Sequence, residues 1–218
     1  MELLAPAGSR QALTAAVQSG ADAVYLGGPQ FGARYSAENF TIEEMKTWVD
    51  YCHLYGVDVH VTVNTLVKEK EIESLKEYLK QLNEIGVDAL IVQDMGAVEI
   101  IKKTVPDMTL HASTQMTVTS LEGVKYLEDM GFSRVVLARE LSEKEIEHIC
   151  KNAKAEIEVF VHGAICMCYS GQCLMSSILG GRSGNRGRCA QPCRLPYDLL
   201  ENGKTVKSGY VLSPKDMA

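Results

Sequence analysis

The sequence repeats one unit, in which a helix-like stretch is followed by a glycine and then by a short apolar strand. Four of these glycines are easy to place, at Gly20, Gly56, Gly86 and Gly131. Glycine suits the left-handed backbone position that ends a helix, and an apolar run without alternation suits a strand that is buried on both faces. Alternating helices and buried strands predict a parallel β-sheet covered by helices.

Seven strands fit this pattern, and helices of the expected period lie between them. We expect the strands at residues 2–5, 23–27, 58–63, 89–93, 109–113, 134–138 and 156–161. Two helix starts have the spacing of a capping box, Thr41 with Glu44 and Ser142 with Glu145. Cys52 and Cys150 fall inside predicted helices, where we expect them to be small buried side chains.

The number of units favours a closed barrel over an open sheet. No glycine-rich dinucleotide fingerprint is present, so we predict a (β/α) barrel of the TIM type. Such a barrel needs an eighth strand, and the pattern ends instead at Ser213-Pro214, which has the residues of a helix start. We therefore expect a barrel that is truncated before its eighth strand, in a chain that is a fragment of a longer protein.

The pattern divides the chain into three parts. Residues 1–163 hold the seven barrel units, residues 164–196 form a loop rich in cysteine and arginine, and residues 197–218 hold a hairpin and the start of the next barrel element. Asn202-Gly203 has the composition of a two-residue hairpin turn. The loop and the hairpin follow the seventh strand, as an insertion at one mouth of the barrel.

Charge and hydropathy limit the possible partners. No apolar stretch is long enough to cross a membrane and no signal peptide is visible, so we expect a cytoplasmic protein without a membrane partner. The formal net charge is −6, but residues 182–194 contain four arginines and no acid. Such a segment fits a local RNA-binding surface, and it equally fits a solvated polar loop.

Five of the seven cysteines lie within 28 residues, at positions 166, 168, 173, 189 and 193. In a reducing compartment a cluster like this indicates a metal site or a catalytic site more than disulfides. Zinc sites usually contain tight cysteine pairs, and only Cys189 and Cys193 approach that spacing. The wide spacing fits an iron–sulfur cluster at least as well, with zinc as the lesser alternative.

The same segment carries a family resemblance. Glu158-Val-Phe-Val-His-Gly-Ala-Ile-Cys166, followed after six residues by Cys173-Leu-Met-Ser, resembles the signature of the U32 family, long labelled collagenase-like peptidases. Further stretches that resemble the family are spread over the chain: Glu2-Leu-Leu-Ala-Pro-Ala-Gly-Ser, His111-Ala-Ser-Thr-Gln, Val136-Leu-Ala-Arg-Glu, Gly184-Asn-Arg-Gly-Arg-Cys and Leu212-Ser-Pro-Lys-Asp.

The resemblance implies a cofactor and a set of ligands. Better-understood relatives look like oxygen-independent hydroxylation factors with a [4Fe–4S] cluster, and Cys166, Cys173 and Cys189 match three cluster ligands. For the fourth ligand we favour Cys193, with Cys168 or a residue beyond position 218 as alternatives.

The resemblance also implies a substrate. Relatives act on the wobble uridine of tRNA with prephenate as the oxygen source, on ribosomal RNA, or on a ubiquinone precursor. We expect an RNA-hydroxylating enzyme or component, which can need a paired U32 subunit. A peptidase is the alternative, although no metalloprotease or serine-hydrolase motif is present. A further alternative is a non-catalytic subunit that carries the cluster.

The site of a (β/α) barrel lies at the carboxyl ends of its strands, and five polar residues are expected there or in the loop above. Arg139 suits a carboxylate or an RNA phosphate, but it can equally form a structural salt bridge. His162 suits acid–base catalysis or a structural role. Asn64 and Gln115 can bind substrate or belong to a polar layer inside the barrel. Arg186 is a substrate-binding candidate in the arginine-rich loop.

Overall fold

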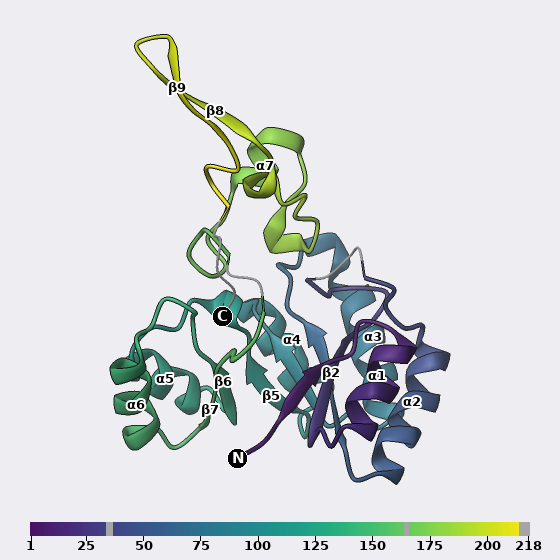
Figure 1. The fold of residues 1–218 in the computed structure, drawn as a ribbon. Helices are drawn as coiled ribbons and strands as arrows, with labels where there is room; N and C mark the ends of the chain where they lie inside the picture. The colour runs from purple at the N-terminus through teal and green to yellow at the C-terminus, as the bar shows by residue number, and fades with distance from the viewer. Residues whose placement is uncertain (34–36, 164–165, 214–218) are drawn as a thin grey trace.

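The computed structural model describes residues 1–33, 37–163 and 166–213. Its centre is one parallel sheet whose seven strands are paired in chain order, from β1 to β7 (Figure 1). The strands are β1 (Leu4–Pro6), β2 (Ala23–Gly27), β3 (Asp58–Val63), β4 (Ala89–Val92), β5 (Thr109–Ala112), β6 (Arg134–Val136) and β7 (Glu156–Glu158). All seven predicted strands are therefore confirmed, with differences at their ends.

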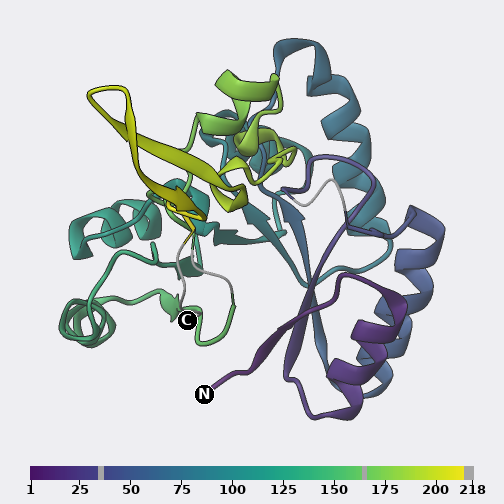
Figure 2. The same ribbon diagram turned by 45° about the horizontal axis from the view of Figure 1, so that its top comes forward.

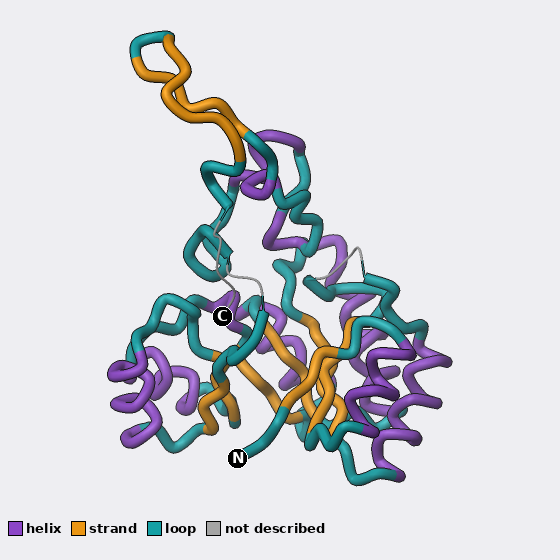
Figure 3. Tube along the Cα trace, viewed as in Figure 1, coloured by secondary structure: helices purple, strands orange, loops and turns teal. Residues whose placement is uncertain are grey.

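Six helices alternate with the strands and lie along the outer side of the sheet (Figure 3). They are α1 (Arg10–Gln18), α2 (Ile42–Leu54), α3 (Ile72–Glu84), α4 (Met95–Thr104), α5 (Leu121–Asp129) and α6 (Glu143–Asn152). Both predicted capping boxes are present, at Thr41 and at Ser142. The four glycines of the repeat have φ between +70° and +86°, which confirms their place after helices.

The core lies between the strands and the helices. All four residues of β4 are buried, as expected for a strand that is covered on both faces. Cys52 is also buried, as predicted, but the prediction for Cys150 was wrong because this thiol is exposed. Its neighbour Ile149 takes the inward position on α6 and leaves Cys150 on the solvent side.

The sheet is curved, and ion pairs connect its two ends. Arg134 on β6 binds both Glu156, its register partner on β7, and Glu2, which precedes β1 at the opposite edge of the sheet. His60 and His111 lie inside this end of the sheet, where they are buried and their rings meet edge to face. The fold is therefore TIM-like, a seven-stranded curved α/β sheet, as predicted.

The chain leaves the sheet earlier than predicted after β7. The strand ends at Glu158, and Phe160 and Val161 are 41% and 78% exposed. No strand follows on that edge within the described residues, so these side chains have no inward face to occupy.

Above the sheet stand α7 (Met175–Gly180) and a two-stranded hairpin of β8 (Tyr197–Glu201) and β9 (Lys204–Gly209) (Figures 1 and 2). Two short 3₁₀ turns, at Gly184–Arg186 and Pro192–Arg194, connect α7 to the hairpin. Asn202 and Gly203 have φ of +50° and +77°, which confirms the predicted hairpin turn. The predicted helix start at Pro214 lies outside the described residues.

Candidate functional site

The cysteine-rich loop is fastened over the carboxyl ends of β5 and β6. The backbone N–H of Ser170 donates to the Glu140 carboxylate at 2.8 Å, and the Thr117 hydroxyl donates to the Ser170 carbonyl at 2.6 Å. Gly171 lies so close to the backbone of Gln115 that a Cβ there would be 2.1 Å from the Gln115 carbonyl oxygen. These contacts fix Ser170 and Gly171, which stand between Cys168 and Cys173, on the rim where the sites of (β/α) barrels lie.

A second attachment holds residues 182–194, the arginine segment, over the ends of β2 and β3. The Leu66 N–H donates to the Asn185 carbonyl at 3.1 Å, and the Arg186 guanidinium donates to both Glu71 oxygens at 2.6 and 2.9 Å. Gly187 packs against backbone, because a Cβ on it would be 2.5 Å from the Gly32 carbonyl oxygen. The segment is thus a fixed part of the rim.

The thiols of the loop lie close enough to influence one another. Burial raises the pKa of Cys193, the neighbouring Arg194 guanidinium lowers it in part, and the thiols Cys166, Cys189 and Cys173 raise it. Burial also raises the pKa of Cys168, and the neighbouring Cys173 thiol raises it further. Because thiolates repel one another, deprotonating this group calls for a compensating positive charge such as that of bound metal.

The donor set fits an iron–sulfur cluster in its chemistry. Thiolate sulfur is the ligand that holds such clusters, and all five candidate cysteines are free thiols in this part of the chain. Among the described residues, no three His, Cys, Asp or Glu side chains converge closely enough to hold one metal ion. An iron–sulfur cluster does not require its cysteines to converge on one metal ion, because each thiolate binds a separate iron.

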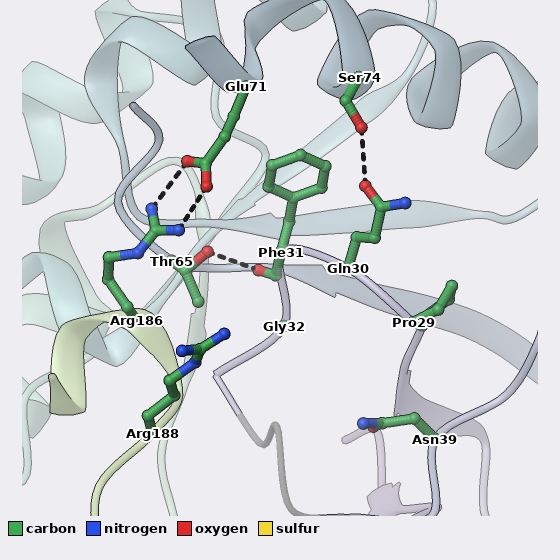
Figure 4. Close-up of a pocket in the computed structure, with 11 residues that line it drawn as sticks. Pro29, Gln30, Phe31, Gly32, Asn39, Thr65, Glu71, Ser74, Arg186 and Arg188 are labelled. Carbon is green, nitrogen blue, oxygen red and sulfur yellow. Dashed lines mark hydrogen bonds and ion pairs between the residues drawn. The ribbon is translucent and has the colours of Figure 1, made fainter. Parts of the chain in front are cut away.

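A cavity of about 210 Å³ opens beside the arginine segment (Figure 4). Its walls come from the chain after β2, from the start of α3 and from the arginine segment. The residues that line it are Gly28, Pro29, Gln30, Phe31, Gly32, Asn39, Thr65, Glu71, Ser74, Arg186 and Arg188. Arg186 was a predicted substrate-binding residue, and the structure places it here with its charge paired to Glu71.

Asn64 and Gln115 lie at the rim, as the sequence predicted, but the contacts the structure shows for them are structural. Asn64 donates to the Ser113 hydroxyl at 3.3 Å and accepts from the Ala33 N–H at 2.9 Å, so it ties three strand ends together. Gln115 supports Gly171 through its backbone. Their roles in binding substrate stay predictions.

Arg139 and His162 are both exposed. The Arg139 backbone N–H points to the Ser170 hydroxyl at 3.5 Å, so the residue stands next to the cysteine loop. Its guanidinium forms no ion pair with any residue that the structure describes, so the salt bridge considered as an alternative is not seen among these residues. For His162 the structure adds only its exposure and its place ahead of the cysteines, and its catalytic role stays a prediction.

Phe31 and Glu71 were not among the predicted site residues, whereas Arg188 belongs to the arginine-rich residues 182–194 that fit an RNA-binding surface. Glu71 looked like one charge among several in a polar stretch, because its partner Arg186 is 115 positions away. Gly27 at the end of β2, with Gly28 and Gly32 just after it, was the available signal that this loop approaches other groups closely.

A profile of peptidase family U32 matches residues 8–218. The chain belongs to this family. Across the part of the U32 chain that the structure describes, no helix is both long and apolar enough to pass through a membrane.

Two relatives carry names from RNA modification. The chain is 45% identical over 218 residues to the 23S rRNA 5-hydroxycytidine synthase of Escherichia coli, with 99% of this chain and 33% of that protein covered. It is 40% identical over 224 residues to the tRNA hydroxylation protein P1 of Bacillus subtilis, with 99% and 53% covered. The U32 chain thus spans a third to about half of the length of these relatives.

A solved structure supports the fold. The U32 peptidase Mk0906 superposes with a TM-score of 0.62 at 21% identity, over 75% of this chain and 70% of that one. At this identity the likeness shows a shared architecture alone.

Proposed function

We propose that this U32 chain is the barrel part of an oxygen-independent RNA-hydroxylating enzyme that works with a [4Fe–4S] cluster. The observation that carries the proposal is the attachment of the cysteine-rich loop, through Ser170 and Glu140, to the rim where (β/α) barrels carry out their chemistry. The two relatives named for rRNA and tRNA hydroxylation support an RNA substrate.

For the cluster we propose Cys166, Cys173 and Cys189 as ligands, with Cys193 as the fourth. Their mutual influence within one loop supports this choice over scattered structural thiols. When bound, such a cluster supplies electron transfer that needs no molecular oxygen. Cys168, which contacts Cys173, is the residue to test as an alternative fourth ligand.

For the substrate we propose a pyrimidine in RNA, with the tRNA wobble uridine as the first candidate. A cytidine in 23S rRNA is the second candidate, because the relative that bears that name is 45% identical to this chain. Prephenate is the proposed oxygen donor. The exposed guanidinium of Arg139, beside the cysteine loop, could bind its carboxylates bidentately. A cytoplasmic location would follow from either RNA.

The test is nucleoside mass spectrometry on a strain that lacks the gene, with tRNA and rRNA analysed separately. We expect one hydroxylated pyrimidine to disappear and to return with the wild-type gene but not with Cys189→Ala. The exposed helical cysteine gives a matched control, so Cys150→Ala should restore the nucleoside fully. Unchanged nucleosides in both RNA pools would refute the proposal and would direct attention to the peptidase alternative.

A paired U32 subunit stays a prediction. The hairpin exposes Leu199, Leu200 and Val206, each more than half accessible, and offers such a partner a surface. Co-purification of a second U32 chain with the tagged protein would support it.

A further inference from the structure

The cavity beside the arginine segment combines three kinds of chemical group (Figure 4). Phe31 supplies an aromatic ring, Gln30 and Asn39 supply side-chain amides, and Arg188 supplies a guanidinium. An aromatic ring can stack on a base, an amide can bond to the edge of a base, and a guanidinium can bind a phosphate.

The aromatic ring is held in place by its surroundings. Phe31 has a φ of +59°, a left-handed conformation that a bulky residue rarely adopts. The Thr65 hydroxyl donates to the Phe31 carbonyl at 3.1 Å, and the Tyr78 ring packs against the Phe31 ring with centroids 5.9 Å apart. Strained residues of this kind persist where the neighbouring structure fixes them, and they cluster at ligand-binding positions.

The amide of Gln30 also has a fixed orientation. The Ser74 hydroxyl, on the first turn of α3, donates to the Gln30 side-chain oxygen at 2.8 Å. This bond orients the amide at the cavity wall before any ligand arrives. A donor that is already oriented loses less conformational entropy when it binds.

The lining carries a net positive charge. Arg186 and Arg188 are the two cations, and Glu71 is the one carboxylate. Glu71 pairs with Arg186, and the Arg186 guanidinium lowers the pKa of that carboxyl to about 2, so the pair stays charged and closed at neutral pH. Gly187, packed against Gly32, sets the position of the next residue, Arg188, at the cavity.

We propose that this cavity receives one unstacked nucleotide of a single-stranded RNA loop, with its base on Phe31 and its phosphate at Arg188. The inference rests on the proposed RNA substrate and adds the place where that RNA is read. A base within a duplex is stacked on two neighbours and cannot enter a cavity of about 210 Å³ unless it leaves the stack, so an unstacked base is the form that this cavity can receive. A small carboxylate would use the guanidinium but not the ring and the amides.

The test uses the protein with a hairpin RNA whose single-stranded loop carries 5-iodouridine, and a fully paired duplex of the same stem sequence as the comparison. Irradiation should cross-link the loop RNA to the peptide that contains Phe31, and the duplex should not cross-link there. Phe31→Leu should weaken loop binding about tenfold or more, because one base loses its stacking partner. Arg188→Gln should lower the salt dependence of binding by about one phosphate contact.

Matched controls remove an exposed aromatic ring and an exposed positive charge elsewhere, with Tyr126→Leu on α5 and Lys103→Gln on α4. Both should bind as the wild type does, and circular dichroism should show all four variants folded. Loop binding that is unchanged in the Phe31 and Arg188 variants would overturn this inference alone. If malonate binds at the cavity and the RNA stays bound, the cavity belongs to a small carboxylate, and this result would also overturn the inference. A wild-type protein that binds neither RNA would overturn the proposed function as well.

Discussion

Arg134 on β6 and Glu2 ahead of β1 are joined by two hydrogen bonds of 2.5 and 2.6 Å, although 132 positions separate them in the chain. The Arg134 side chain is 9% exposed, and it also bonds to Glu156 at 2.5 Å. Because β1 and β6 belong to opposite parts of the sheet, this contact requires the sheet to curve back on itself. It therefore holds the curvature of the sheet at the amino ends of the strands, opposite the rim that carries the cysteine-rich loop.

Removal of Arg134 should destabilise the fold strongly. Arg134→Ala leaves Glu2, Glu156 and Glu158 without their cation, and because the arginine is buried while Glu2 and Glu156 are 34% and 66% exposed, we expect a cost of about 1.5–3 kcal/mol. Urea unfolding followed by circular dichroism measures the loss. The control is Arg10→Ala, whose partner Glu44 lies on the surface, and which should cost much less than Arg134→Ala. Equal losses for the two variants would contradict a structural role for Arg134.

Glu158 should make stability fall as the pH rises. Burial raises the pKa of Glu158 to about 7. Arg134, 3.7 Å away, offsets only part of this rise, because its guanidinium also pairs with Glu2 and Glu156. The folded protein keeps this proton where the unfolded chain has released it, so the free energy of unfolding decreases between about pH 4.5 and pH 7. Above pH 7, Glu158→Gln should be more stable than the wild type, by roughly 2–3 kcal/mol. Identical pH profiles of urea unfolding would contradict this account.

Gly28 and Tyr78 should show coupled effects. A Cβ on Gly28 would lie 1.9 Å from the Tyr78 hydroxyl oxygen, which is buried and has no hydrogen-bond partner among the described residues. Gly28→Ala should therefore destabilise the protein by about 1–3 kcal/mol. Tyr78→Phe should be nearly neutral or stabilising, because it removes an unsatisfied buried group.

The double variant tests the contact itself. With the hydroxyl gone, Gly28→Ala should cost less than it does in the wild type, and thermal unfolding of the four proteins gives the coupling energy. Strict additivity would show that the two positions do not meet.

The Glu71–Arg186 pair should protect the arginine segment from proteolysis. Glu71→Gln removes the carboxylate that holds Arg186 at 2.6 Å, and the segment should then detach more often from the rim. Limited trypsin digestion should cleave faster after the arginines at 182–194, with the barrel left intact. Glu73→Gln, which loses only an exposed pair with Lys76, should digest like the wild type. If both variants digest alike, the pair does not hold the segment.

The sequence predicted the barrel because its signals are local. Glycines after helices, capping boxes and unbroken apolar runs each depend on neighbours within a few residues, and every predicted strand was found. The ends of strands were harder to predict. The predicted strand 156–161 continues past Glu158 with Val159, Phe160 and Val161, but whether these residues pair depends on what lies beside β7, which the local sequence does not contain.

The site could be predicted only in part, because the contacts that position it join residues that are distant in the sequence. Clustered cysteines are visible in the sequence, because five thiols stand close along the chain. The contacts that position them are not, since Ser170 meets Glu140 across 30 positions and Arg186 meets Glu71 across 115. Cys150 shows the opposite error, because a helical period places a residue on a face but does not fix the width of the buried stripe.

The central claim is that the cysteines of residues 166–193 hold the iron–sulfur cluster on which RNA hydroxylation depends. Anaerobic purification followed by iron, sulfide and zinc analysis, with an ultraviolet–visible spectrum, tests it most directly on the wild type, Cys189→Ala and Cys150→Ala. We predict a brown protein with about four iron and four sulfide per chain, retained in Cys150→Ala and lost in Cys189→Ala. A colourless wild-type protein, or one with a single zinc and no sulfide, would contradict the claim.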